Sequence, residues 1–119
     1  MLKENNFSIG VDIESIARFS NLKRRESKNF LEKIFTEKEL DYCLSKENFA
    51  QHLASHFAAK EAVVKALGSF RKKPIALSKI VISHSAQGVP AVTLKGYSVK
   101  ISLSHCEDKA VAFVMVKKQ

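Results

Sequence analysis

Two carboxylates occupy unusual places in the sequence. Asp12 lies beside small and apolar residues in a segment with strand-like alternation, and Glu61 interrupts the apolar positions of a helical segment. An isolated buried carboxylate is costly, so each acid needs an ion-pair partner or a bound cation. Two carboxylates with few other polar ligands suit Mg²⁺, which prefers oxygen, keeps several waters and is usually completed by a substrate phosphate.

Lys65 offers a simpler partner for Glu61. It follows Glu61 by four residues, the spacing of an ordinary helical ion pair worth a few tenths of a kcal/mol. From these residues alone, the ion pair and the metal site are equally compatible with the pattern.

The element that must position Glu61 is a long helix, predicted from about Asn48 to Gly68. Its apolar residues recur with the 3.6-residue period of a buried face, and the glycine supplies a C-terminal stop. This stripe consists of Phe49, Leu53, Phe57 and Val64. Glu61 falls beside it, bordered by Ala50 and Ala54, which are too small to cover a carboxylate.

Asp12 lies on a strand predicted over Phe7 to Ile13. Ile9, Val11 and Ile13 share one face, and Gly10 and Asp12 share the other. We expect the apolar face to pack on the core and Asp12 to point away from it.

Two further helices are predicted before the long one. Ser15 is a candidate cap for a helix running through Arg18 and Phe19 towards Arg25, and the capping box from Thr36 to Glu39 begins a helix ending at about Leu44. If one helical phase continues past Ser27, then Arg18, Arg25 and Lys28 share a face. Each of these charges taken singly is more typical of a solvated surface.

The C-terminal third changes to a period of two, which predicts strands separated by turn residues. They are Ile80 to Ser85, Ala91 to Leu94, Val99 to Ser104 and Ala110 to Val116. Their close spacing favours an antiparallel meander, and the last strand, apolar on both faces, belongs in its centre. The fold class is therefore α+β, an antiparallel sheet packed against one long helix, in a single domain over residues 1–119.

Composition narrows the function classes. A net charge of +8 and a pI near 9.6 suggest an anionic partner. We expect a cytoplasmic protein, because no signal-peptide core or membrane-length apolar run is present. Cys43 and Cys106 are expected to be reduced, since their separation fits neither a CxxC nor a metal motif.

The histidines give weaker signals. His52 and His56 have zinc-helix spacing, but Leu53 stands where a metalloprotease keeps its glutamate. His105 and Cys106 point to opposite faces of a strand, which argues against a catalytic dyad. His105 ends an apolar strand face, and taken alone it is more typical of a structural histidine.

Two segments carry a family resemblance. Residues 9–19, IGVDIESIARF, are similar to the GxDIxxIxRF signature of the small 4'-phosphopantetheinyl transferases of the holo-[acyl-carrier-protein] synthase family. Residues 57–68, FAAKEAVVKALG, resemble the family's second signature, F/W-A-x-K-E-A-x-x-K-A. The FT-x-x-E, GxP and SxSH elements at residues 35–39, 88–90 and 102–105 follow in order, so the resemblance covers the whole chain.

This resemblance implies the 4'-phosphopantetheinyl transferase fold and a Mg²⁺-dependent transfer of phosphopantetheine from coenzyme A to a serine of acyl carrier protein in fatty acid biosynthesis, releasing adenosine 3',5'-bisphosphate. Asp12 and Glu61 would bind the metal, Lys65 would contact the pyrophosphate, and His105 would lie in the coenzyme A pocket. The basic face would dock the acidic carrier through Arg18, Arg25 and Lys28. The resemblance also implies a homotrimer with active sites between subunits, and no nucleic-acid or membrane partner.

Two departures from the family pattern affect the phosphate contacts. His56 stands where relatives often carry arginine, and residues 69–73, SFRKK, replace a glycine-rich loop. We therefore expect Arg71, Lys72 or Lys73 to take over phosphate contacts. The acceptor of the serine's proton is left open between a metal-bound water and a carboxylate such as Glu39, whose capping-box role is at least as compatible.

Two other function classes explain part of the sequence. A basic nucleic-acid-binding α+β module would explain the charge but gives no reason for Asp12 and Glu61. A carrier-binding subunit without catalysis is opposed by the joint presence of Asp12, Glu61 and Lys65.

Overall fold

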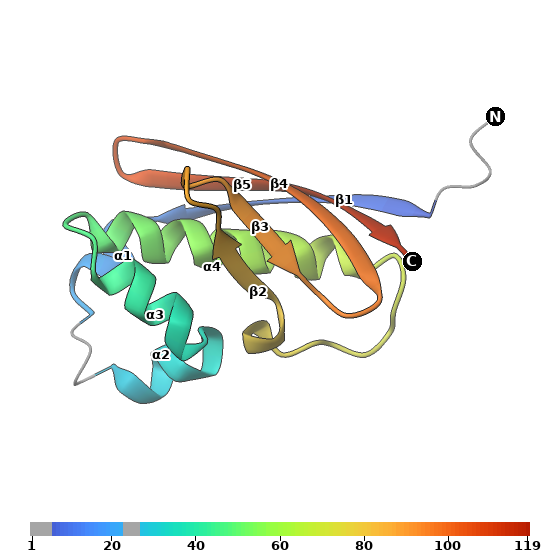
Figure 1. The fold of residues 1–119 in the computed structure, drawn as a ribbon, viewed down its shortest axis with the longest axis horizontal. Coiled ribbons are helices and arrows are strands. Elements are labelled where there is room, and N and C mark those ends of the chain that lie inside the picture. The colour runs from blue at the N-terminus through green and yellow to red at the C-terminus, as the bar shows by residue number, and fades with distance from the viewer. Residues whose placement is uncertain (1–5, 23–26) are drawn as a thin grey trace.

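The computed structural model describes residues 6–22 and 27–119 (Figure 1). The elements in chain order are β1 (Phe7–Ser15), α1 (Ala17–Ser20), α2 (Lys28–Ile34), α3 (Glu37–Leu44), α4 (Phe49–Leu67), η1 (Leu77–Lys79), β2 (Val81–His84), β3 (Pro90–Thr93), β4 (Tyr97–Cys106) and β5 (Lys109–Lys118). In the described part of the chain, no helix is long and apolar enough to cross a membrane. The α+β class is confirmed.

The main sheet is antiparallel and has the strand order β1-β5-β4. The last strand is central, as its two apolar faces predict: Val114 lies opposite Gly10 of β1 and Ile101 of β4. The predicted meander is only partly correct, because β2 and β3 form a separate hairpin. Figure 1 shows this hairpin crossing α4 on the side away from the main sheet, where it covers apolar helix residues that a continuous meander would leave bare.

Helix α4 is the centre of the fold. It begins and ends as predicted, with Asn48 and Gly68 as its caps. The predicted apolar stripe is narrower than the surface that is actually covered, since every residue from Leu53 to Lys60 is buried. A helix covered by a sheet on one side and by a hairpin and α3 on others buries more than one face.

The predicted orientation of β1 is wrong. Ile9, Val11 and Ile13 are more than half exposed, whereas Gly10 is buried and Asp12 is turned towards α4. A Cβ atom on Gly10 would collide with the carbonyl oxygen of Ala62. The face of β1 that carries Gly10 therefore lies directly against the backbone of α4. A β-branched side chain at Gly10 would prevent this close contact.

The predicted first helix is also wrong in its start and extent. Ser15 is still part of β1, paired with Lys109, and the N-cap of α1 is Ile16, whose N–H donates to the carbonyl of Asp108. The helix ends at Ser20. Arg18 and Lys28 consequently belong to different helices and do not share one helical face, and Arg25 lies outside the described residues.

The capping box of α3 is confirmed in both directions. The N–H of Glu39 donates to Thr36 Oγ1 at 3.2 Å, and the N–H of Thr36 donates to Glu39 Oε1 at 2.8 Å. This cap fixes the start of α3 and places the Glu39 carboxylate against α4.

Candidate active site

Asp12 and Lys65 meet where β1 lies against α4. Lys65 Nζ donates to Asp12 Oδ1 at 3.0 Å and to the carbonyl of Val11 at 3.0 Å. Among the described residues, Lys65 forms no ion pair with Glu61. The simple i, i+4 pairing is therefore wrong, and the lysine connects the helix to the strand instead.

The second oxygen of Asp12 is left without a partner. Oδ2 is buried and, with the neighbouring carboxyls ionised, has no hydrogen-bond donor among residues 6–22 and 27–119. A buried carboxylate oxygen without a donor or a cation is unfavourable and rare. The strand therefore holds an oxygen that is available to a ligand atom with positive charge.

Glu14 is a member of the site that the sequence analysis missed. It lies two residues from Asp12 on the same strand face, and the pKa of its carboxyl is raised to about 7, chiefly by burial. A hydrogen bond with Asp12 and the charges of Asp12 and Glu61 contribute to this rise, and Arg18 at 3.2 Å opposes it. The i, i+2 spacing of Asp12 and Glu14 in the sequence places both on one strand face. It indicates a shared site only once the structure shows that this face turns towards α4.

These acids fit a partial Mg²⁺ site. Asp12 and Glu61 both lie near enough to Glu14 to raise its pKa, so negative charge accumulates at this crossing. Within the described residues, no group of three or more His, Cys, Asp or Glu side chains forms a metal site by itself. Mg²⁺ commonly takes one or two carboxylates and fills its remaining positions with water and phosphate, and the orphaned Asp12 oxygen suits such a site.

Glu39 has a structural role. It is almost fully buried, and Oε1 accepts from Lys60 Nζ at 2.8 Å while Oε2 accepts from the N–H of Ile82 at 2.7 Å. Both oxygens are occupied away from solvent. The structure therefore supports the capping-box interpretation and gives Glu39 no route to a substrate proton.

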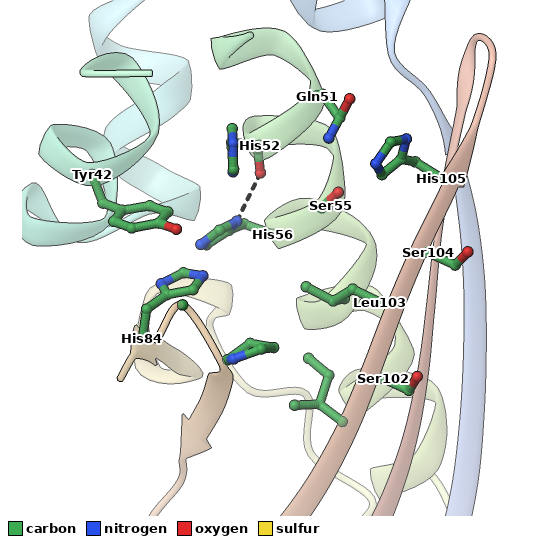
Figure 2. A pocket seen from close by; sticks show the side chains of 13 residues that line it. Tyr42, Gln51, His52, Ser55, His56, His84, Ser102, Leu103, Ser104 and His105 are labelled. Atoms are coloured by element: carbon green, nitrogen blue, oxygen red, sulfur yellow. Dashed lines mark hydrogen bonds between the residues drawn. The ribbon is translucent and has the colours of Figure 1, made fainter. Parts of the chain in front are cut away.

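His105 lies in a second region, a cavity of about 380 Å³ between α4 and the ends of β2 and β4 (Figure 2). The cavity brings together the GxP turn, the SxSH segment and residues of α3 and α4. Its lining includes Tyr42, His52, His56, His84, Gly88, Pro90, Ser102, Ser104 and His105. Burial lowers the pKa of His52 and of His84, so this wall favours neutral imidazoles.

Arg71 and Lys72 lie elsewhere. Together with Lys73 they line a smaller cavity of about 190 Å³ beyond the C-terminal end of α4. Arg71 Nε donates to the carbonyl of Lys73 at 3.0 Å, which folds the loop back on itself. Among the cavities lined by described residues alone, Arg71 and Lys72 line a different one from His105.

Arg18 contacts the acidic site, although about half of its side chain is exposed to solvent. Its guanidinium lies 5.1 Å from the ring centroid of Phe57 and 3.2 Å from Glu14. Lys28 is exposed on α2. Of the three predicted docking residues, Arg18 and Lys28 therefore lie on separate helices, and Arg25 lies outside the described residues.

Comparison with known proteins decides the family. A model of the 4'-phosphopantetheinyl transferase superfamily matches residues 8–114. The chain belongs to this superfamily. It is 40% identical to a holo-[acyl-carrier-protein] synthase of Thermodesulfovibrio yellowstonii, over 91% of this chain and 96% of that one. It is 42% identical to the Chlorobaculum parvum synthase, over 92% and 97%.

Solved structures agree with the sequence comparison. The Helicobacter pylori holo-[acyl-carrier-protein] synthase, in complex with coenzyme A, superposes with a TM-score of 0.78 at 34% identity, covering 92% of this chain and 99% of that one. The Bacillus anthracis synthase gives 0.77 at 29% identity, over 94% and 96%. The chain is therefore an enzyme of the holo-[acyl-carrier-protein] synthase type, a transferase.

Proposed function

We propose that this enzyme transfers the 4'-phosphopantetheine group of coenzyme A to a serine hydroxyl of acyl carrier protein, with Mg²⁺, and releases adenosine 3',5'-bisphosphate, as a step in fatty acid biosynthesis in the cytoplasm. The observation that carries the proposal is the unpartnered, buried Oδ2 of Asp12 in a cluster of acids, beside a lysine that holds the other oxygen. Transfer of a phosphate-linked group needs mainly positioning and neutralisation of charge, which this site provides.

Asp12 and Glu61 are the residues that would hold the metal. When bound, Mg²⁺ supplies positive charge that offsets the charge developing on the pyrophosphate. Lys65 is the movable part, because its side chain is half exposed and is tied to Asp12 by an ion pair. A cation held by Asp12 would release the Lys65 ammonium from its ion pair, and the ammonium would then be free to contact the leaving phosphate.

The cavity near His105 is proposed as the coenzyme A pocket. The Helicobacter pylori and Bacillus anthracis structures are complexes with coenzyme A, which supports placing the same ligand on this fold. A cavity of about 380 Å³ is in the usual size range of small-ligand sites. Arg71 and Lys72 are proposed to contact coenzyme A phosphates from a neighbouring subunit, since they do not line this cavity in their own chain.

A homotrimer is proposed because β1 turns an apolar face outward. The exposed large apolar side chains of the main sheet are Phe7, Ile9, Val11, Ile13, Phe113 and Met115. Contiguous exposed apolar surface typically marks an interaction site. Light scattering should give three chain masses at micromolar concentration, and a stable monomer would contradict the trimer.

The carrier protein is proposed to dock through the basic residues Arg18, Arg25 and Lys28. The net charge of +8 favours an acidic protein substrate. We expect Arg18→Ala to raise the KM for the carrier and to weaken its dependence on salt, although its contact with Glu14 makes Lys28→Ala the cleaner variant.

The direct test combines the purified enzyme, coenzyme A, Mg²⁺ and apo acyl carrier protein, followed by intact mass of the carrier. The proposal predicts a mass gain of one phosphopantetheine group, dependent on the carrier's serine. Absence of this gain with several bacterial carriers would refute the proposed function.

A further inference from the structure

One wall of the cavity near His105 consists of stacked rings. The rings of Tyr42 and His84 lie parallel, with centroids 3.9 Å apart and an interplanar angle of 9°, and the His56 ring is 5.0 Å from that of His84. Figure 2 shows these three side chains directed towards one another from α3, α4 and the end of β2. The stack fixes the position of His56 in the cavity wall.

The hydrogen bonds of His56 determine which of its nitrogens carries a proton. Nδ1 lies 2.7 Å from the carbonyl oxygen of His52, drawn as a dashed line in Figure 2. Because a carbonyl oxygen only accepts, Nδ1 must be the donor. Nε2 therefore carries a free lone pair unless the ring is charged. This atom is buried and finds no partner among the described residues.

The surroundings of His56 favour the neutral ring. The residue is 1% exposed, and the pKa of its imidazole is lowered to about 4, chiefly by burial and in smaller part by the charges of His84, His52 and Lys60. The bond to the His52 carbonyl raises the pKa and only partly offsets this. At neutral pH the cavity wall thus presents a bare acceptor.

We propose that His56 is a specificity residue of this cavity, whose Nε2 accepts a hydrogen bond from a neutral N–H or O–H group of the ligand. The inference rests on the proposed function, in which the ligand is coenzyme A, and it assigns to Nε2 an amino or hydroxyl group rather than a phosphate. An ionised phosphate oxygen, the main form at neutral pH, has no hydrogen to donate, and its charge opposes the lone pair. An unsatisfied buried acceptor is costly, and a ligand donor removes that cost on binding.

Three replacements separate an acceptor from a donor at this position. The amide oxygen of His56→Gln can accept, the side chain of His56→Leu can do neither, and His56→Arg can only donate. We expect coenzyme A to bind His56→Gln within about threefold of the wild type and both others at least tenfold more weakly by calorimetry. Repeating the titration in buffers of different ionisation enthalpy should show equal proton uptake by the wild type and His56→Gln.

Three results would contradict the proposed role of His56. Tighter binding by His56→Arg, or one extra proton taken up by the wild type, would show a charged His56 contacting phosphate. Equal affinity of His56→Leu and the wild type would show that the ligand does not contact His56. In each of these cases coenzyme A still binds, so the proposed function survives; failure of the wild type to bind coenzyme A would overturn both.

A measurement on the wild type covers the case in which the variants do not fold. Nitrogen NMR of the imidazoles at pH 7 should show His56 with a protonated Nδ1 and a bare Nε2, and the Nε2 signal should shift when coenzyme A is added. A protonated Nε2 in the complex would overturn the inference.

Discussion

Adjacent residues of α4 belong to two contrasting charge clusters. Lys60 is fully buried, and its Nζ donates to Glu39 Oε1 at 2.8 Å and to the carbonyls of Leu77 and Ile80 at 3.0 and 2.8 Å. The other oxygen of Glu39 accepts from Ile82. All three ammonium hydrogens and both carboxylate oxygens of this cluster are used, and it joins α3, α4, η1 and β2.

The neighbouring Glu61 faces the opposite kind of cluster. Asp12 retains an unpartnered buried oxygen, and the pKa of Glu14 is raised to about 7. Buried charges that serve the fold are saturated by hydrogen bonds, whereas Asp12 keeps a buried oxygen that no donor contacts in the part of the chain that the structure describes. This difference supports the proposal that the acids around Asp12 bind a cation together with the substrate phosphate.

The largest effect on stability is expected at the saturated cluster. Lys60→Met leaves Glu39 buried with one strong partner missing, so we expect a loss of about 3–5 kcal/mol in the free energy of unfolding, measured with urea. Adding Glu39→Gln should recover part of the loss. A Lys60→Met enzyme as stable as the wild type would show that this pair does not hold the fold.

The largest effect on activity is expected at the other cluster. Asp12→Asn and Glu61→Gln remove the charge that would hold the metal, so kcat should fall on the order of 10²–10³-fold, the size typical of losing one major electrostatic contribution. The melting temperature should stay the same or rise, because repulsion among the acids decreases. Unfolded variants would instead assign these acids a structural role.

The sequence predicts those features of the two clusters that depend on neighbouring residues in the chain. The capping box of Glu39 and the limits of α4 depend on neighbouring residues, and both were predicted correctly. The alternation in β1 shows that the strand has two faces but not which one packs. That choice depends on the fit of Gly10 against Ala62, a contact between segments 52 residues apart by their numbering.

The same limit explains what was missed in the site. Glu14 joins Asp12 only if the small-residue face turns inward, and the cavity near His105 needs α3, α4 and two strands to meet. The family signatures supplied Asp12, Glu61 and Lys65 without that knowledge. They gave no role to His56, whose unpartnered nitrogen is visible only in three dimensions.

His56 adds a second unsatisfied buried atom, beside Asp12 Oδ2, and predicts a pH effect. Its pKa of about 4 lies below the unfolded value of 6.5, so its contribution to stability is complete above pH 6.5 and is lost as the pH falls towards 4. The loss should approach roughly 3 kcal/mol. Urea unfolding from pH 7 to pH 4 should show a smaller decrease for His56→Gln, and parallel curves would contradict the low pKa.

A smaller effect tests how β1 holds Asp12 against the helix. Gly10→Ala forces a methyl group against the Ala62 carbonyl, and we expect a loss of about 1–3 kcal/mol in stability together with lower activity, since the strand that carries Asp12 must move. Gly96→Ala is a suitable control for a glycine far from that contact, although its φ of +89° carries its own strain. Unchanged activity in Gly10→Ala would show that the placement of Asp12 tolerates this shift.

The most direct test of the central claim is a calorimetric titration of Mg²⁺ into the enzyme with coenzyme A present. The account predicts one metal per site in the wild type, and at least tenfold weaker binding in both Asp12→Asn and Glu61→Gln. Lys60→Met, where folded, should bind Mg²⁺ like the wild type. Equal Mg²⁺ affinity in the wild type and Asp12→Asn would contradict the assignment of the unpartnered carboxylate to the metal.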